Sequence, residues 1–184
     1  MVDRMPGAAL PTLVVVGGPP AAGKTWIAGE LAAKLGFPLL AKDTLKEVLG
    51  EALGTRERPD SQRLGAGVFE VLGLVVRELL RAGVSTIVEG NFSARTHVLD
   101  ALPPARVVQV HVTAAPEVLR ERLLTRDSHR HPVHYDREAA AEIAARAAAG
   151  EWEPLALAGD LVLVNTTDDF AIDLGALTDR IRLT

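Results

Sequence analysis

The residues with the clearest chemical meaning in this chain lie between Gly18 and Thr25. The segment GPPAAGKT matches the pattern G-x-x-x-x-G-K-[ST] at every fixed position. Backbone N–H groups of such a loop can surround phosphate oxygens, and the N-terminus of the following helix favours anions. The lysine reaches the β- and γ-phosphates, and the threonine hydroxyl binds Mg²⁺. The alternative is a turn needed only for packing, but the complete motif between a strand and a helix favours phosphate binding.

This loop predicts a site for a nucleoside triphosphate with Mg²⁺, in which ATP is the expected nucleotide and GTP the alternative. The residues predicted to bind the nucleotide are Gly18, Pro19, Pro20, Ala21, Ala22, Gly23, Lys24 and Thr25. A further nucleotide contact is predicted at Thr166, which follows a later strand. The alternative there is a simple polar turn.

A carboxylate, Asp43, follows the apolar residues 37–41, which have the pattern of a short strand. Ligands of parallel sheets bind at the carboxyl ends of the strands, so Asp43 is expected beside the loop. It is predicted to act as the catalytic base that accepts the proton of an attacking hydroxyl, and so to bind the substrate. The alternative role is a helix cap. Thr44 and Glu47 form a capping-box pattern, which leaves Asp43 spare.

A second carboxylate, Glu89, follows the apolar residues 84–88. A carboxylate at such a strand end can hold Mg²⁺ directly or through water, and the predicted metal site is therefore Thr25 with Glu89. The alternative is a solvated strand end. Asn91, two residues further on, is predicted to hydrogen-bond the substrate.

Several arginines lead into residues 128–135, where the helical pattern breaks: Arg120, Arg122, Arg126 and Arg130. Arginines at the end of a helix that enters a mobile segment suit a lid closing on a transferring phosphate. Arg126 and Arg130 are the best placed and are predicted to be catalytic together with Lys24. The alternative is an ordinary solvated helix face.

Three histidines fall in or beside the same break: His129, His131 and His134, followed by Asp136. Their spacing fits no short helical pair of metal ligands, and Pro132 interrupts it. Contacts with a lid or a substrate are therefore favoured over a structural metal site.

Five apolar segments alternate with helical patterns along the chain. Strands are expected near residues 12–17, 37–41, 84–88, 106–112 and 161–164, and helices near 24–35, from 44 on, 61–81, 93–101, 115–127, 136–149 and 169–181. Residues 50–60 are expected to form a loop, and Asp136 is expected to cap the helix that follows it. This alternation predicts an α/β fold with a parallel sheet covered by helices on both faces.

Composition narrows the class of protein further. Of the 184 residues 48% are hydrophobic, there is no cysteine, and the formal net charge is −4. Disulfides and thiolate metal sites are excluded, and there is no overall basic character for binding nucleic acid. No apolar run approaches the length of a membrane-spanning helix. We expect a cytoplasmic protein, monomeric or homodimeric, with one domain over residues 1–184 and a lid over about 120–140.

The chain resembles the small P-loop kinases that include chloramphenicol phosphotransferase, zeta toxins and bacterial kinases of the polynucleotide-kinase type. The resemblance rests on GGPPAAGKT, on Lys42-Asp43-Thr44 and VEGNF after the second and third strands, on RERLLTRDSHRHPVHYD, and on EWEPLAL followed by DLVLVNTTDD. It implies a three-layer P-loop NTPase fold with strand order 2-3-1-4-5 and a small helical lid. It also implies Mg²⁺-dependent γ-phosphoryl transfer, a substrate carboxylate at Asp43 and lid arginines near Arg126 and Arg130. Relatives often have aspartate where this chain has Glu89, and the longer side chain favours a water-mediated contact with the metal.

Three functions agree with these residues. The first is an ATP-dependent kinase that phosphorylates a hydroxyl of a small molecule such as a metabolite, a sugar or an antibiotic. The second is a 5′-hydroxyl nucleic-acid kinase, against which the acidic charge balance counts. The third is a non-catalytic, nucleotide-binding regulatory module, which has no need of a base at Asp43. A plain NTPase is a further alternative.

Overall fold

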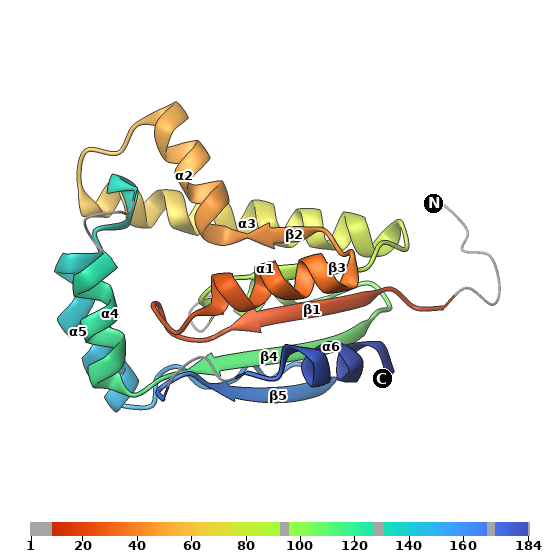
Figure 1. The fold of residues 1–184 in the computed structure, drawn as a ribbon. Coiled ribbons are helices and arrows are strands. Elements are labelled where there is room, and N and C mark those ends of the chain that lie inside the picture. The colour runs from red at the N-terminus through yellow and green to blue at the C-terminus, as the bar shows by residue number, and fades with distance from the viewer. Residues whose placement is uncertain (1–8, 93–95, 127–130, 169–171, 184) are drawn as a thin grey trace.

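The computed structural model describes residues 9–92, 96–126, 131–168 and 172–183. Strands and helices alternate along the chain (Figure 1). The strands are β1 (Thr12–Gly17), β2 (Leu39–Ala41), β3 (Thr86–Glu89), β4 (Arg106–Thr113) and β5 (Asp160–Asn165). The α-helices are α1 (Lys24–Leu35), α2 (Lys42–Leu53), α3 (Arg58–Arg81), α4 (Pro116–Arg126), α5 (Asp136–Ala148) and α6 (Leu174–Leu183), with 3₁₀ turns η2 (Thr96–Leu99) and η4 (Pro132–His134).

The five strands form one parallel sheet in the order β2-β3-β1-β4-β5. Glu89 on β3 is in register with Val16 on β1 and with Ala41 on β2. The carboxyl ends of these three strands therefore meet at one edge, where the loop after β1 and the start of α2 are found. The predicted α/β fold and the strand order implied by the resemblance are both confirmed.

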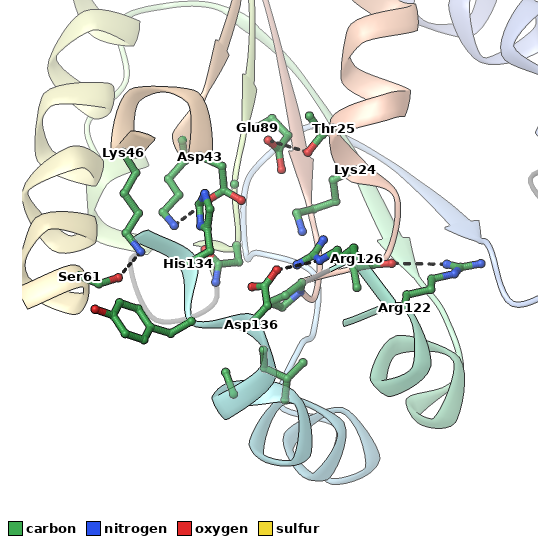
Figure 2. A pocket seen from close by; sticks show the side chains of 18 of the residues that line it. Lys24, Thr25, Asp43, Lys46, Ser61, Glu89, Arg122, Arg126, His134 and Asp136 are labelled. Atoms are coloured by element: carbon green, nitrogen blue, oxygen red, sulfur yellow. Dashed lines mark hydrogen bonds and ion pairs between the residues drawn. The ribbon is translucent and has the colours of Figure 1, made fainter. Parts of the chain in front are cut away.

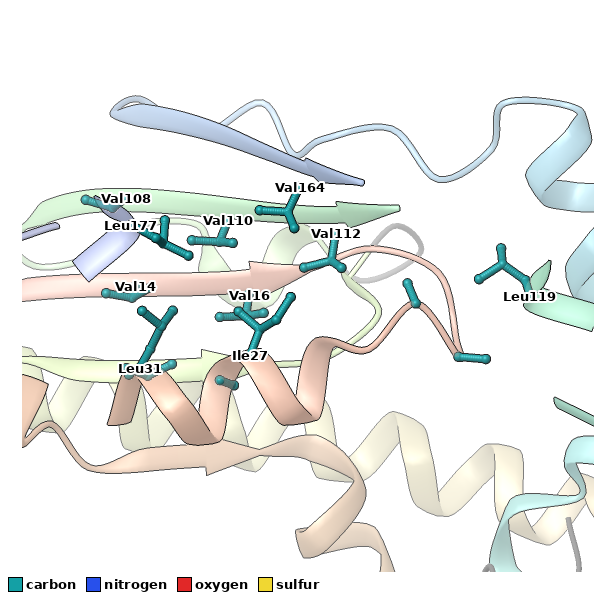
Figure 3. Close-up of a cluster of buried hydrophobic side chains, with 14 of the residues drawn as sticks. Val14, Val16, Ile27, Leu31, Val108, Val110, Val112, Leu119, Val164 and Leu177 are labelled. Atoms are coloured by element: carbon teal, nitrogen blue, oxygen red, sulfur yellow. The ribbon is translucent and has the colours of Figure 1, made fainter. Parts of the chain in front are cut away.

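Successive residues of the central strand β1 point to opposite sides of the sheet, and helices cover both sides of this strand. On one side Val14 and Val16 pack with Ile27 and Leu31 of α1 (Figure 3). The same cluster takes in apolar residues of α4, α5 and α6. On the other side Leu13 and Val15 pack with apolar residues of α3. All residues of β1 are buried, so this strand lies at the centre of a three-layer structure.

Two predicted helix caps are wrong. Helix α2 begins at Lys42 directly after β2, and its N-cap residue Ala41 has no side-chain cap. Thr44 therefore lies within the first turn and does not cap it. Helix α5 begins with Asp136 itself, after Tyr135 in the left-handed region with φ of 46°. Neither helix start has a side-chain cap, so the local capping pattern does not describe it.

The loop expected over residues 50–60 is confirmed only over 54–57, because α2 continues to Leu53 and α3 already begins at Arg58. Gly50 lies buried inside α2, where a Cβ atom would come within 2.9 Å of Val133 Cγ2. The glycine that suggested a loop instead permits close packing against η4. Helices α4 and α5 lie beside each other beyond the carboxyl ends of the strands (Figure 1). No helix in the described part of the chain is both long and apolar enough to cross a membrane.

Candidate active site

A cavity of about 640 Å³ opens at the carboxyl edge of the sheet. One wall is formed by the loop after β1 and the start of α1, and another by α2 and α3. Side chains from α4, α5 and the segment around η4 close the remaining side. The predicted residues Lys24, Thr25, Asp43, Glu89, Asn91 and Arg126 all line this cavity. The fold thus brings together side chains that are spread over a hundred residues of sequence.

The loop after β1 has a backbone shape that depends on its glycines. Gly18 has φ of 128°, and a Cβ atom there would lie 1.9 Å from the Val112 carbonyl oxygen. Gly23 has φ of 89° and precedes α1, whose first turn has no side-chain cap. Ala21 is also left-handed, with φ of 65°, which is strained for a residue with a Cβ atom. The uncapped helix start facing the cavity is suited to binding an anion.

The predicted loop residues divide into two groups. Pro20, Ala21, Gly23, Lys24 and Thr25 line the cavity. Gly18, Pro19 and Ala22 are buried and form the part of the loop that packs against the sheet.

Lys24 is buried at the centre of the site (Figure 2). Its ammonium donates a hydrogen bond of 2.7 Å to the Pro19 carbonyl oxygen, so the side chain folds across its own loop. Burial lowers the pKa of Lys24 below 10.5, against the opposing effect of the Glu89 and Asp43 carboxylates. A desolvated cation of this kind interacts strongly with phosphate oxygens that reach it.

Thr25 and Glu89 form the predicted metal site. The Thr25 hydroxyl lies 3.4 Å from Glu89 Oε2, and Glu89 is only 3% exposed. A hydroxyl and a carboxylate oxygen beside a phosphate-binding loop are hard oxygen ligands that suit Mg²⁺. The ion usually retains water molecules at its remaining coordination positions. The residues therefore fit this ion. No group of three or more His, Cys, Asp or Glu side chains in the described ranges is arranged to hold a metal by itself.

Asp43 lies on the α2 side of the cavity, at the first turn of that helix. Its Oδ1 atom is 2.8 Å from Lys42 Nζ, and its side chain is 31% exposed. Asp43 is also close enough to Lys24 to influence the pKa of that lysine. A substrate in the cavity would have this carboxylate on one side and the phosphate loop on the other. Asn91 lines the cavity next to Gly90.

The arginines of α4 have different surroundings. Arg126 lines the cavity, and its Nε atom is 2.9 Å from Asp136 Oδ2 on α5. Arg122 donates to the Thr166 carbonyl oxygen at 2.6 Å and to the Thr166 hydroxyl at 2.9 Å. Arg130 and His129 lie outside the described residues.

Thr166 is fully buried behind the loop. Its hydroxyl oxygen lies 3.0 Å from the Ala22 carbonyl and 3.1 Å from the Thr113 carbonyl, besides accepting from Arg122. Thr166 supports the loop from behind, and a direct contact with the nucleotide stays a prediction.

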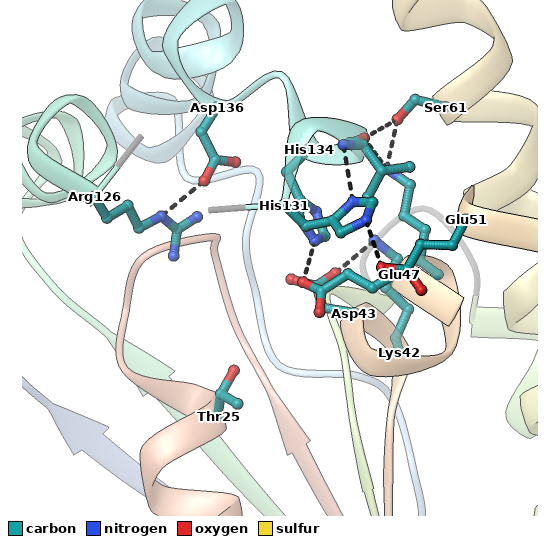
Figure 4. Close-up of polar contacts among 12 residues, drawn as sticks. Thr25, Lys42, Asp43, Glu47, Glu51, Ser61, Arg126, His131, His134 and Asp136 are labelled. Carbon is teal, nitrogen blue, oxygen red and sulfur yellow. Dashed lines mark hydrogen bonds and ion pairs between the residues drawn. The ribbon is translucent and has the colours of Figure 1, made fainter. Parts of the chain in front are cut away.

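The two described histidines of the sequence break contact α2. His134 Nε2 lies 2.7 Å from Glu47 Oε1, and His131 Nε2 lies 3.5 Å from Glu51 Oε1 (Figure 4). His134 lines the cavity, and both rings hold the segment to α2. The favoured role of this segment in lid or substrate contacts stays a prediction.

Several cavity residues were missed by the sequence analysis. They are Trp26, Lys42, Lys46, Arg58, Ser61, Gln62 and Tyr135, while Asp136 had been considered only as a helix cap and beside the histidines. Lys42 and Lys46 are four residues apart on one helix face, a spacing that could have indicated a shared site. Trp26 directly follows the loop motif on α1. The residues of α3 and Tyr135 carried no local signal, because only the packing of α3 and η4 brings them to the cavity.

Comparisons with known proteins agree with this arrangement. The family model described as AAA domain matches residues 13–149. The crystal structure of a candidate kinase from Chloroflexus aurantiacus J-10-fl is 36% identical, covers 95% of this chain and 98% of its own, and has a TM-score of 0.84. A sugar kinase from Janibacter sp. HTCC2649 is 21% identical over 94% of this chain and 92% of its own, with a TM-score of 0.57, and shares the fold. No curated protein matches the chain.

Proposed function

Because this chain belongs to the AAA domain family and forms a kinase-like P-loop domain, we propose that it is a kinase. It transfers the γ-phosphoryl group of ATP, with GTP as the alternative donor, to a hydroxyl group of a small molecule. The 36% identity with the Chloroflexus candidate kinase over nearly the whole of both chains supports the general class.

One observation carries the proposal: the cavity extends past the phosphate loop to a carboxylate on another helix. Lys24 and Thr25 lie on the loop side, while Asp43 lies on the α2 side of the same 640 Å³ space. Hydrolysis of a nucleotide needs room only for water beside the γ-phosphate. An acceptor molecule requires additional polar space with a carboxylate near its hydroxyl, and the α2 side of the cavity with Asp43 offers both.

The proposed reaction assigns one role to each residue. The acceptor hydroxyl oxygen forms a bond to the γ-phosphorus while its proton passes to Asp43. The bond between the γ-phosphorus and the oxygen that bridges to the β-phosphate breaks, and the nucleoside diphosphate leaves. Lys24 and Arg126 stabilise the negative charge on the phosphoryl oxygens, because both are cations fixed beside the loop.

Mg²⁺ would be held by Thr25 and Glu89, the latter directly or through water. When bound, the ion neutralises charge on the β- and γ-phosphates. The residues that surround it have a separate task, which is to orient the phosphate chain and to keep the acceptor hydroxyl in line with it.

The test is a screen of hydroxylated compounds with ATP and Mg²⁺, read by a mass gain of roughly 80 Da, that of one phosphoryl unit replacing hydrogen. Neutral sugars, hydroxy acids, sugar phosphates, aminoglycoside and phenicol antibiotics, and a 5′-hydroxyl oligonucleotide form the panel. Lys24→Ala is the control for transfer by this site. A product made by the wild type and not by Lys24→Ala supports the proposal. Phosphorylation of the oligonucleotide alone favours the nucleic-acid kinase, and nucleotide binding with no product from any class favours the regulatory module.

A further inference from the structure

Trp26 presents a large aromatic side chain to the cavity at the start of α1. It lines the 640 Å³ space together with Lys24 and Thr25, which precede it, and 45% of its surface is exposed. The other tryptophan of the chain, Trp152, is only 8% exposed, and the guanidinium carbon of Arg146 lies 4.7 Å from the centre of its ring. Trp152 is thus packed into the protein, whereas Trp26 offers aromatic surface to a molecule that enters the cavity.

The backbone of α1 fixes where a phosphate chain would lie relative to Trp26. The N–H groups in the first turn of a helix point out of the helix end and favour an anion there. In α1 the Ile27 N–H donates to the Gly23 carbonyl oxygen at 3.2 Å, so the N–H groups of residues 24–26 belong to that first turn. A phosphate chain bound at this helix end and at Lys24 would therefore pass directly beside the Trp26 backbone.

The cavity has two ends, which lie toward opposite edges of the sheet. Asp43 follows β2 at one edge, and Arg122 donates to the carbonyl oxygen of Thr166, which follows β5 at the other edge. Figure 2 shows Asp43 and Arg122 on opposite sides of Lys24. The proposed transfer takes place on the Asp43 side, so the nucleoside of the donor would extend from Lys24 away from Asp43.

The direction of the Trp26 side chain follows from its neighbours on α1. Successive residues of a helix are rotated by about 100°. The Thr25 hydroxyl lies 3.4 Å from Glu89 of β3, and Ile27 packs into the core on the sheet. Trp26 stands between these two residues in the sequence and leaves α1 on a third, exposed side. This direction favours a contact with the nucleoside over one with the metal site or the acceptor hydroxyl.

From this arrangement we infer that the indole of Trp26 stacks on the base of the donor nucleotide and selects a purine. The inference rests on the proposed kinase function and names the residue that recognises the nucleoside part of the donor. Every base has a π-face that can stack on an aromatic ring, and the two rings of a purine cover more of an indole than the single ring of a pyrimidine. Trp26 is therefore expected to favour adenine and guanine nucleotides over those of cytosine and uracil, and not to distinguish adenine from guanine.

Inorganic tripolyphosphate separates the base from the phosphates, because it has a chain of three phosphates and no nucleoside. It and the non-hydrolysable analogue AMP-PNP are titrated calorimetrically into the protein with Mg²⁺. Trp26→Ala is expected to weaken AMP-PNP about fivefold or more, the lower end of the range for a base stacked on an aromatic ring, and to leave tripolyphosphate unchanged. Trp26→Phe keeps an aromatic ring and should retain most of the AMP-PNP affinity. Trp152→Phe is the matched control and should bind both probes like the wild type.

Tryptophan fluorescence gives a readout that does not depend on affinity. The chain has two tryptophans, so Trp152→Phe leaves Trp26 as the single indole. Saturating AMP-PNP is expected to quench its emission, because a stacked base contacts the ring directly, while saturating tripolyphosphate should change it much less. Calorimetry with ADP and CDP then tests the choice of base: ADP should bind more tightly to the wild type, and this preference should shrink in Trp26→Ala.

Three results would overturn the inference: an unchanged AMP-PNP affinity in Trp26→Ala, an equal loss of AMP-PNP and tripolyphosphate, or a loss confined to the KM of the acceptor. The second would mean that Trp26 only shapes the phosphate loop, and the third that it contacts the acceptor. If Trp26→Ala does not fold, the fluorescence of Trp152→Phe still decides. Failure of both AMP-PNP and tripolyphosphate to bind the wild type would instead contradict the proposed kinase function, so the two failures are distinguishable.

Discussion

The Thr25 hydroxyl lies 3.4 Å from Glu89 Oε2, although 64 residues separate them in the chain. Parallel pairing of β1 and β3 causes this approach, because Glu89 is in register with Val16 just before the phosphate loop. Two oxygens from different elements are thus held where Mg²⁺ accompanies a nucleotide.

Glu89→Gln is expected to raise the Mg²⁺ concentration needed for half-maximal transfer, while nucleotide affinity in EDTA changes less. The amide keeps the shape of the side chain but lacks the charge that attracts the ion. Activity is measured against Mg²⁺ concentration at saturating ATP. Asp43→Asn, which removes a different cavity carboxylate, is the control and should keep the wild-type Mg²⁺ midpoint for its residual activity. Identical midpoints for Glu89→Gln and the wild type would exclude Glu89 from the metal site.

Asp43→Asn is expected to lose acceptor phosphorylation by roughly 10²–10⁴-fold, the usual contribution of a positioned base. The amide still accepts a hydrogen bond but cannot take up a proton near neutral pH. Nucleotide binding and slow hydrolysis to the diphosphate should persist, since water still reaches the γ-phosphate. Single-turnover assays with an identified acceptor give the rate. Full activity of this variant would show that another group accepts the proton.

Arg126→Ala is expected to lower kcat by up to about 10³-fold, with little change in nucleotide affinity, because a lid arginine acts mainly on the transition state. Asp136→Asn keeps Arg126 but weakens the 2.9 Å contact that orients it. Its loss in kcat should therefore be smaller. A pure increase in KM for both variants, with kcat unchanged, would assign Arg126 to ground-state binding. Arg130→Ala is predicted to behave like Arg126→Ala.

The pH dependence of stability tests the burial of Lys24, whose pKa lies below 10.5 in the folded protein because of desolvation. Between that lowered pKa and 10.5 the unfolded chain binds the proton more tightly than the folded protein, so stability rises with pH. At pH values below the lowered pKa, Lys24 is protonated in both the folded and the unfolded state. The folded protein then bears the full free-energy cost of burying the Lys24 charge. Urea unfolding without nucleotide is compared for the wild type and Lys24→Met. The wild type should gain stability relative to the variant as pH rises through the window, and parallel curves would contradict the buried ammonium.

Thr166→Val is expected to lower the free energy of unfolding by roughly 1–3 kcal/mol, the range for leaving buried hydrogen-bond partners unsatisfied. The lost hydroxyl lies 3.0 Å from the Ala22 carbonyl, so the loop should also bind nucleotide more weakly. Thr166→Ser retains the hydroxyl and should restore most of both properties. An unchanged stability in Thr166→Val, measured by urea unfolding, would rule out this support of the loop.

Much of the framework could be predicted from local patterns. The bounds of β1 and α1 agree with the expected residues 12–17 and 24–35, and Gly36 ends α1 in a left-handed conformation. These features depend on neighbours in the chain: an apolar run, a glycine-rich turn and helical spacing. The strand order came from the resemblance, because periodicity describes each strand but not its partners.

The sequence by itself determined that a phosphate loop leads from a strand into a helix, and that Asp43 and Glu89 follow later strands. Only the tertiary structure decided what surrounds them. The capping box at Thr44 was wrong because β2 leads directly into α2. The prediction of a loop at Gly50 was wrong because a helix there packs on Val133, which is 83 residues further along the chain. Lys46 reaches the carbonyl of that same residue across 87 positions. Such contacts depend on how whole helices and strands pack together. A short stretch of sequence does not specify which distant residues it will contact.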